Sequence, residues 1–355
     1  MLSNVTWIAV NNQTPSTSYD NGDIIPVVTG GAVATDFGIR MTVDLGTLGS
    51  EYAYTATIRD YGSGEPETYY KNSHDGLSFV IQPKGSIVIN LDVYPKPTIV
   101  LWDDCDNSYT LMEKEGIVAS SITLQERTLY KDGAWNTLCL PFDVTDGNTS
   151  DGVSFTGTPL EGATVMSLKT SKSNGSGFDS EKGTLTLNFT DASSIQAGKP
   201  YIVRWEKPNG YDSNPSDFDI IDPTFTNVAI SKTAPTPSTS YDKKVSFIGT
   251  FSPVLLQKNT TSNLYIGADN NLYYPNVDNY YVNAFRAYFH VDLGTSTVRS
   301  YNLSFGDEET GIATTDFTDY TDKTDSWYTL DGRRLNGKPT AKGLYIHGGK
   351  TVVMK

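Results

Sequence analysis

The feature that most constrains this fold is the alternation of apolar and polar residues within short segments. Over residues 39–45 every second side chain is apolar, and the four that share one face are Ile39, Met41, Val43 and Leu45. This period of two is typical of half-buried strands, and turn signals such as Asn21-Gly22 separate the segments. No amphipathic helix of normal length interrupts the pattern, so we expect an all-β chain.

The chain has 355 residues, which is enough for roughly two or three domains. Segments over 1–97 have the spacing of an immunoglobulin-like β-sandwich. Pro95 and Pro97 then break the pattern, because proline cannot donate to a central ladder, and 98–116 is expected to be a junction. Further strand segments over 117–305 predict a larger, jelly-roll-like β-sandwich. These segments are residues 121–124, 135–142, 163–168, 184–189, 200–205, 245–251, 264–266, 284–291 and 297–305.

Two short regions follow the second sandwich. Residues 306–326 are acidic and rich in threonine, with too few large apolar side chains to fold alone, and are expected to be a linker. Residues 327–355 regain strand character, so we expect a short antiparallel β-hairpin tail there.

Two peptides occur twice along the chain. Thr-Pro-Ser-Thr-Ser-Tyr-Asp stands at 14–20 and at 236–242, and Val-Asp-Leu-Gly-Thr stands at 43–47 and at 291–295. Because the two separations differ (236 − 14 = 222 and 291 − 43 = 248), these echoes do not establish a domain duplication.

Composition limits the partners. Lys plus Arg number 27 against 41 for Asp plus Glu, which gives a formal net charge of −14. Nucleic acid is not an expected partner, because phosphate backbones are held mainly by clustered Lys and Arg. No apolar stretch approaches the ~20 residues of a membrane helix, so no transmembrane segment is expected.

Catalytic signals are few. The three histidines lie in different segments, so a zinc site or a histidine-based triad has little to build on. There is no Gly-x-Ser-x-Gly nucleophile elbow. Carboxylates are plentiful, but sequence spacing cannot show whether two of them face each other, as glycoside hydrolysis requires. We expect a chain that is not an enzyme and has no cofactor.

One local pattern partly matches a calcium-binding loop. Asp104, Asp106 and Ser108 place oxygens at alternate positions, and Glu115 stands at the twelfth. Tyr109 occupies the sixth position, where such a loop needs glycine, and strands flank the segment instead of helices. We therefore expect an Asx-rich turn and no metal site, with these oxygens as the candidate ligands otherwise.

Cys105 and Cys139 are the two cysteines of the chain. A disulfide between them would close a long loop and stabilise the fold in an oxidising compartment. Two independent thiols are the other outcome, and the sequence leaves both open.

Paired tyrosines give the best indication of a binding site. In an extended pair such as Tyr69-Tyr70 the two rings point to opposite faces, so one ring of each pair is expected to be exposed. The segment from residue 273 to residue 281 combines two such pairs with amide and carboxylate groups, as a sugar-binding platform does. Its candidate ligand-binding residues are Tyr273, Tyr274, Asp278, Asn279, Tyr280 and Tyr281.

Three segments resemble large, mostly uncharacterised secreted or surface proteins of Bacteroidota. They are residues 127–142, 284–289 and the closing block of 328–335 with 342–346. The closing block is similar to the last strands of C-terminal sorting domains read by type IX secretion, which implies a sorting role for 327–355. The resemblance implies a secreted or cell-surface location and brings no catalytic motif.

These observations favour an exported β-sandwich protein that acts in adhesion or glycan binding, with glycans or other surface proteins as partners. One alternative is an accessory module or divergent member of a polysaccharide-degrading system, which would show two facing carboxylates in a cleft. A second alternative is a structural surface or fimbrial subunit, which would show a strand edge open to a donor strand.

Overall fold

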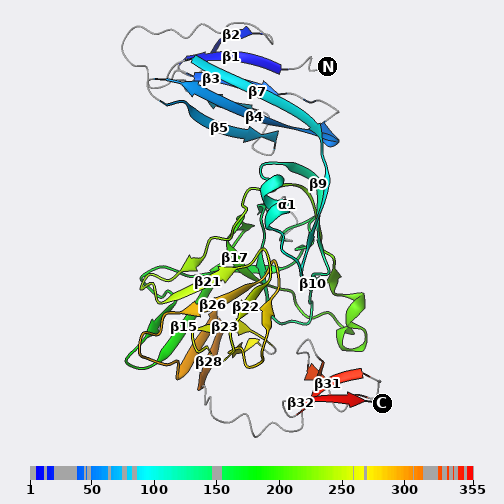
Figure 1. The fold of residues 1–355 in the computed structure, drawn as a ribbon, viewed down its shortest axis with the longest axis vertical. Helices are drawn as coiled ribbons and strands as arrows, with labels where there is room; N and C mark the ends of the chain where they lie inside the picture. The colour runs from blue at the N-terminus through cyan, green and yellow to red at the C-terminus, as the bar shows by residue number, and fades with distance from the viewer. Residues whose placement is uncertain are drawn as a thin grey trace. The chain divides into compact units, whose positions relative to one another are not determined.

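Strands make up nearly all the regular structure of the chain (Figure 1). Among the residues described below, the one α-helix is α1 (Ser108–Glu113), and short 3-10 helices include η4 (Tyr211–Ser213) and η5 (Pro215–Asp217). None of these helices is long and apolar enough to cross a membrane. The predominance of strands confirms the expected all-β fold. The computed structural model describes residues 5–11, 14–19, 38–43, 45, 49–62, 65–73, 78–81, 86–145, 154–258, 260–267, 270–306, 308–314, 327–329, 334–335, 339, 343–347 and 350–354.

Contacts divide the chain into two compact units, each built from separated segments. The first unit contains residues 1–100, 112–123 and 224–231, and the second contains 101–111, 124–223 and 232–355. In the first unit, β9 (Val118–Gln125) pairs antiparallel with β19 (Thr224–Ala229), which comes about a hundred residues later.

The strand β19 was missed by the sequence analysis for a physical reason. Asn227 has a φ of 53°, and neither it nor the opposite residue Ser120 is among the paired residues, although the register is the same on both sides. Phe225 and Val228 are both buried although they are three residues apart. The left-handed backbone at Asn227 interrupts the regular alternation on which the prediction of strands depended.

The first unit contains three sheets. In two of them all neighbours are antiparallel, with strand orders β2-β1-β3-β6 and β5-β4-β7, and the third has the order β19-β9-β8. Alternate residues of the central strand β4, among them Tyr54 and Ala56, are buried against Leu91 and Val93. The Asn21-Gly22 turn lies outside the described residues. The further strands are β1 (Val5–Asn11), β2 (Thr14–Tyr19), β3 (Gly38–Val43), β4 (Tyr52–Tyr61), β5 (Glu67–Asn72), β6 (Ser78–Ile81), β7 (Ser86–Pro95) and β8 (Thr98–Trp102).

Two large sheets of the second unit share one hydrophobic core. The seven-stranded sheet has the order β11-β17-β13-β15-β27-β28 with β14 beside β15, and the five-stranded sheet has the order β20-β21-β26-β23-β24. The neighbours are antiparallel except for the parallel pair β15 and β27.

Each of the nine segments expected over 117–305 contains a strand. The strands of the two sheets are β11 (Asn136–Cys139), β13 (Thr164–Leu168), β14 (Gly177–Asp179), β15 (Thr184–Asp191), β17 (Pro200–Arg204), β20 (Ser238–Thr239), β21 (Val245–Gly249), β23 (Asn263–Ile266), β24 (Leu272–Tyr273), β26 (Ala287–Val291), β27 (Ser300–Phe305) and β28 (Glu308–Thr314). Short pairs add β10 (Thr128–Leu129) with β18 (Ile220–Ile221), β12 (Val144–Thr145) with β16 (Ser194–Ile195), and β22 (Val254–Leu256) with β25 (Tyr280–Val282).

Phenylalanine rings join the two large sheets. The ring centroid of Phe189 on β15 lies 6.0 Å from that of Phe247 and 6.3 Å from that of Phe289, both on the other sheet and both edge-to-face with it. Phe247 and Phe289 are cross-strand partners that stack at 4.6 Å. Burying each such ring stabilises the fold by about 1.5–3 kcal/mol, so this contact makes the two sheets a β-sandwich.

The tail is a small antiparallel sheet, as expected. Its strand order is β30-β29-β31-β32, with all neighbours antiparallel. The expectation of a linker over all of 306–326 is wrong, because β28 extends the large sheet by pairing with β27 through backbone hydrogen bonds that need few apolar side chains. Residues 315–326 lie outside the described part of the chain. The tail strands are β29 (Trp327–Thr329), β30 (Arg334–Leu335), β31 (Gly343–His347) and β32 (Lys350–Met354).

A buried carboxylate anchors the start of the second unit. Asp103 is 4% exposed, forms an ion pair with Arg286, and accepts a hydrogen bond from Asn283 Nδ2 at 2.9 Å. Arg127 is 3% exposed and donates to the carbonyl oxygens of Thr128 and Thr137. Burial and the neighbouring charge of Arg286 lower the pKa of Arg127 to about 9, and the Asp103 carboxylate opposes that shift.

The buried amide of Asn107 ties the adjoining loop to the sandwich. Its Oδ1 accepts from the backbone N–H of Trp102 at 2.9 Å, and its Nδ2 donates to the carbonyl oxygen of Phe251 at 2.8 Å. The same Nδ2 lies within hydrogen-bond distance of the carbonyl oxygens of Trp102 and Cys105. One buried side chain thus connects backbone groups of this loop with the backbone of Phe251.

We predict that Asp103→Asn lowers the free energy of unfolding by about 3–5 kcal/mol, because it leaves the charges of Arg127 and Arg286 without their carboxylate. Chemical denaturation measures the change. The exposed neighbour provides a control, since Asp104→Asn should stay within about 0.5 kcal/mol of the parent. Equal, small effects of the two variants would show that the Asp103 pair is not an anchor.

Candidate functional site

The tyrosines predicted to form a platform mostly pack against one another. The rings of Tyr265 and Tyr280 stack with centroids 4.4 Å apart, and those of Tyr265 and Tyr273 stack at 5.8 Å. A Cβ atom on Gly267 would lie 2.7 Å from the Tyr273 ring, so the ring needs a glycine beneath it. Stacking of this kind uses the ring faces that a sugar would need.

Burial also marks Tyr274 and Tyr280 as packing residues. Tyr274 lies against the core of the sandwich, and burial raises its pKa to about 12. Burial, with a smaller effect of Tyr265, also raises the pKa of Tyr280 well above its usual value. Both hydroxyls therefore stay protonated at any physiological pH.

The other predicted residues of this segment lie at the surface. Asp278 forms an exposed ion pair with Lys258 at 3.2 Å, and Asn279 turns the chain with a φ of 59°. Tyr281 is 51% exposed and is the cross-strand partner of Leu255. The structure thus leaves Tyr281 as the exposed ring among the four predicted tyrosines.

The three tyrosine pairs divide differently between core and surface. The expectation of one exposed ring per pair is confirmed for Tyr280-Tyr281. It is wrong for Tyr69-Tyr70, where both rings are exposed, and for Tyr273-Tyr274, where both are half-buried. Tyr69 and Tyr70 lie on the edge strand β5, which exposes both of its faces, whereas Tyr273 and Tyr274 lie where β24 ends and both faces are partly covered. Alternation in the sequence does not distinguish these two cases.

The acidic segment expected to form a turn caps the helix α1. Asp106 Oδ1 accepts from the Ser108 N–H at 3.0 Å, from the Ser108 hydroxyl at 2.6 Å and from the Ser252 hydroxyl at 2.8 Å. The Ser108 bonds, followed by the Ser252 bond, lower the pKa of Asp106. Asp104 accepts from the Cys105 thiol at 3.2 Å, and Glu115 is exposed and belongs to the first unit. Over the described residues, no group of three or more His, Cys, Asp or Glu side chains could hold a metal ion.

Both cysteines are free thiols, so the disulfide that the sequence left open is not formed. Cys105 is exposed, whereas Cys139 is buried and donates to the carbonyl oxygen of Gly198 at 3.3 Å. Burial raises the pKa of Cys139 far above its usual value, which makes this thiol unreactive.

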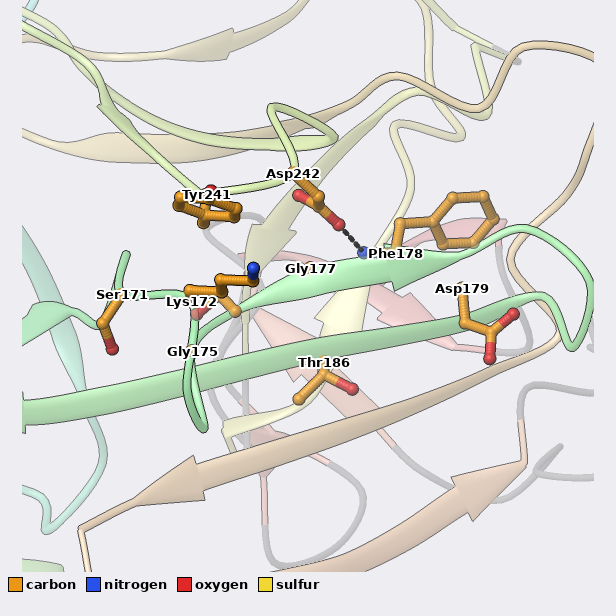
Figure 2. Close-up of a pocket in the computed structure, with 10 residues that line it drawn as sticks. Ser171, Lys172, Gly175, Gly177, Phe178, Asp179, Thr186, Tyr241 and Asp242 are labelled. Carbon is orange, nitrogen blue, oxygen red and sulfur yellow. Dashed lines mark hydrogen bonds between the residues drawn. The ribbon is translucent and has the colours of Figure 1, made fainter.

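A surface hollow of about 340 Å³ lies at one end of the sandwich, between β14 and the turn that follows β20 (Figure 2). Its walls come from residues 171–172 and 175–179, from Thr186 on β15, and from Tyr241 and Asp242. The two sheets of the sandwich thus each contribute one side, and the strands hold these side chains in place.

Asp242 closes the edge of the large sheet inside this hollow. Its Oδ2 accepts the N–H of Phe178 at 3.1 Å, which is an edge-strand donor of β14, and its Oδ1 accepts the Ser240 hydroxyl at 2.5 Å. A Cβ atom on Gly177 would lie 2.6 Å from Oδ2, so only glycine lets the carboxylate approach. Burial opposes ionisation of Asp242, but the bonds from Ser240, Lys244 and Phe178 outweigh it and lower its pKa.

Tyr241 presents an open ring face beside Asp242. The side chain is 62% exposed, and the Lys172 ammonium lies 5.5 Å from the ring centroid (Figure 2). Four other cations lie over aromatic rings in the described part of the chain, and those rings are buried: Trp135, Tyr201, Trp205 and Tyr211. Tyr241 is therefore the ring of this group that a ligand can reach.

Sequence reasoning missed this hollow. Asp242 and Gly177 are 65 residues apart, and only the fold brings them together. A local signal was present, because Ser240 and Asp242 have the spacing of an Asx-type turn and stand in the repeated peptide at 236–242. That signal predicts the turn but not its partner.

We predict that Tyr280→Ala lowers the free energy of unfolding by roughly 2 kcal/mol, because a half-buried ring leaves its stack with Tyr265. Tyr281→Ala is the matched control and should change it by less than about 0.5 kcal/mol. Thermal and denaturant unfolding measure both. If the two variants were equally stable, the stack would contribute nothing to packing.

A second prediction concerns pH. The pKa of Asp242 is lower in the folded chain than in the unfolded one, so its stabilisation is present above about pH 4 and is lost as pH falls through the folded value. Asp242→Asn should therefore lower the free energy of unfolding by about 0.5–1 kcal/mol at pH 7, after allowance for solvent screening.

Denaturant unfolding between pH 7 and pH 2.5 follows this difference, which should shrink at the acid end. The exposed pair residue gives the control, as Asp278→Asn should remain close to the parent at pH 7. A difference for Asp242→Asn that is constant over the whole range contradicts the role of its charge.

No protein-family model, curated protein or solved structure matches this chain. The resemblance of its three segments to secreted or surface proteins of Bacteroidota therefore stays a prediction. What the chain binds has to be argued from the residues of the hollow.

Proposed function

We propose that this chain is an exported, non-catalytic β-sandwich protein, secreted or held at the cell surface, that binds glycans in the hollow at Tyr241. The observation that carries the proposal is the exposed Tyr241 ring at the surface of the sandwich, next to Lys172 and in the same hollow as the Thr186 hydroxyl. The apolar face of a pyranose ring packs on such an aromatic face, while its hydroxyls need donors and acceptors at the rim.

The polar groups around the ring support this assignment. Thr186 is the cross-strand partner of Gly177 and lines the hollow, where its hydroxyl can donate and accept hydrogen bonds. The Lys172 ammonium supplies three donors. A sugar that rests on Tyr241 can therefore exchange its water for protein hydrogen bonds on both sides of the ring.

The aspartates of the hollow favour binding over hydrolysis. A glycosidase needs one carboxyl group whose pKa is raised, so that it holds a proton for the leaving group. Backbone hydrogen bonds from Lys182 lower the pKa of Asp179, and the pKa of Asp242 is lowered too. Both are ionised at neutral pH, which leaves no general acid here.

The two alternative functions make different demands on the structure. An accessory module of a polysaccharide-degrading system would use the same hollow for the same binding, so it differs in partners and not in chemistry. A fimbrial subunit needs an open strand edge, and at β14 the Phe178 N–H that a donor strand would bind is already bonded to Asp242. The immunoglobulin-like form of 1–97 and the jelly-roll-like form of 117–305 remain part of the proposal.

Export rests on the tail. The closing sheet, β29 to β32, forms a separate four-stranded sheet, and its sequence is similar to the last strands of type IX sorting domains. A small sheet that is separate from the large sheets is suited to a role as an address or an attachment.

A glycan array followed by titration calorimetry on the full chain tests the binding role. Tyr241→Ala should weaken the best glycan at least about tenfold, and Tyr241→Phe should bind nearly as well as the parent, because the ring face makes the contact. Tyr281→Ala removes another exposed ring of the same unit and should leave affinity unchanged.

Two results would contradict the proposal in different ways. Failure of the parent chain to bind any glycan would remove the function. Unchanged affinity in Tyr241→Ala, with binding intact in the parent, would remove this site and leave the function.

A further inference from the structure

The hollow contains one charged group that forms no ion pair with the described residues. Lys172 lies over Tyr241 and takes part in none of the ion pairs of the described residues. The comparable lysine Lys207 lies over Tyr211 at 5.6 Å, but it also forms an ion pair with Asp212 at 2.7 Å. An aromatic ring alone does not satisfy an ammonium group, so Lys172 has donors to spare.

The two carboxylates that line the same hollow are already occupied. Asp179 Oδ1 accepts the N–H groups of Glu181 and Lys182, and its Oδ2 faces the Lys182 ammonium at 3.4 Å. Asp242 accepts from the backbone of Phe178 and Lys244. The negative charges of the hollow therefore hold its walls, whereas the positive charge is available to a ligand.

We propose that the hollow selects acidic glycans, with the Lys172 ammonium binding the carboxylate of a uronic-acid-type sugar that lies against the Tyr241 ring. This inference rests on the proposed glycan-binding function and names its ligand class. A charge-assisted hydrogen bond from an ammonium to a carboxylate is roughly twice as strong as a neutral one, so it distinguishes an acidic sugar from its neutral counterpart.

The charge of the whole chain narrows the class further. With a net charge of −14, the protein repels a densely charged polyanion at long range. A single lysine cannot offset that repulsion along a polymer that carries a charge on every residue. The ligand is therefore a glycan in which acidic sugars are spaced among neutral ones.

Titration calorimetry on the full chain tests this with a matched ligand pair. The probes are oligosaccharides with one uronic acid among neutral sugars, and the same oligosaccharides after reduction of the carboxyl group to the primary alcohol. The parent chain should bind the acidic form at least about tenfold more tightly. Lys172→Met should bind the acidic and the neutral form with equal affinity, and Lys172→Arg should keep the preference for the acidic form.

Controls separate this inference from the function on which it rests. Lys207→Met removes a lysine that also covers a tyrosine but is already paired, and it should retain the preference. A mono-sulfated neutral oligosaccharide shows whether any anion suffices, and affinity equal to that of the uronic form would overturn the assignment to carboxylates.

The remaining outcomes are also decisive. Equal binding of acidic and reduced forms by the parent would overturn the inference while glycan binding stands. Binding of neither form, while the glycan array finds another ligand, would overturn it as well. No binding to any glycan would instead refute the proposed function, and thermal unfolding of each variant confirms that it is folded.

Discussion

The second unit depends on one buried negative charge that serves two arginines. Asp103 lies where β8 ends, and its ion pair with Arg286 fixes the loop that leads into β26. Arg127 is buried in the same neighbourhood with its charge only partly balanced, which its lowered pKa reflects. A buried ion pair is costly to desolvate, so its value lies in specifying one arrangement of three distant segments.

The sandwich then determines where ligand-binding side chains can stand. Packing of Phe189 against the opposite sheet fixes the distance between the sheets, and the sheet edge at β14 must be closed because an open edge invites other strands. Asp242 closes it from the opposite sheet, with Gly177 making room. Tyr241 lies in the same turn as Asp242, so the hydrogen bonds of Asp242 also position the Tyr241 ring.

Much of the fold, but little of the site, can be predicted from the sequence. Alternation is local, so the strands around Phe189 and Phe247 follow from it, and the small tail sheet does too. Pairing is not local: no pattern places β15 parallel to β27, and the left-handed backbone at Asn227 interrupts the alternation of β19. The tyrosine pairs were visible, but whether a ring stacks on Tyr265 or faces water is decided by neighbours distant in sequence.

The repeated peptides show how far local chemistry alone reaches. The peptide at 14–20 provides the edge strand β2 of one sheet, and its copy at 236–242 provides the edge strand β20 of another. The other repeated peptide, Val-Asp-Leu-Gly-Thr, begins at the last residue of β3 in its first copy and at the last residue of β26 in its second. In the first sheet β1 lies between β2 and β3, and in the second sheet β21 lies between β20 and β26. Along the chain β1 comes before both of its neighbours, whereas β21 comes after β20 and before β26. Duplication would preserve that order. A short strand of Ser and Thr after a proline instead suits any sheet edge, since it offers little to a further strand.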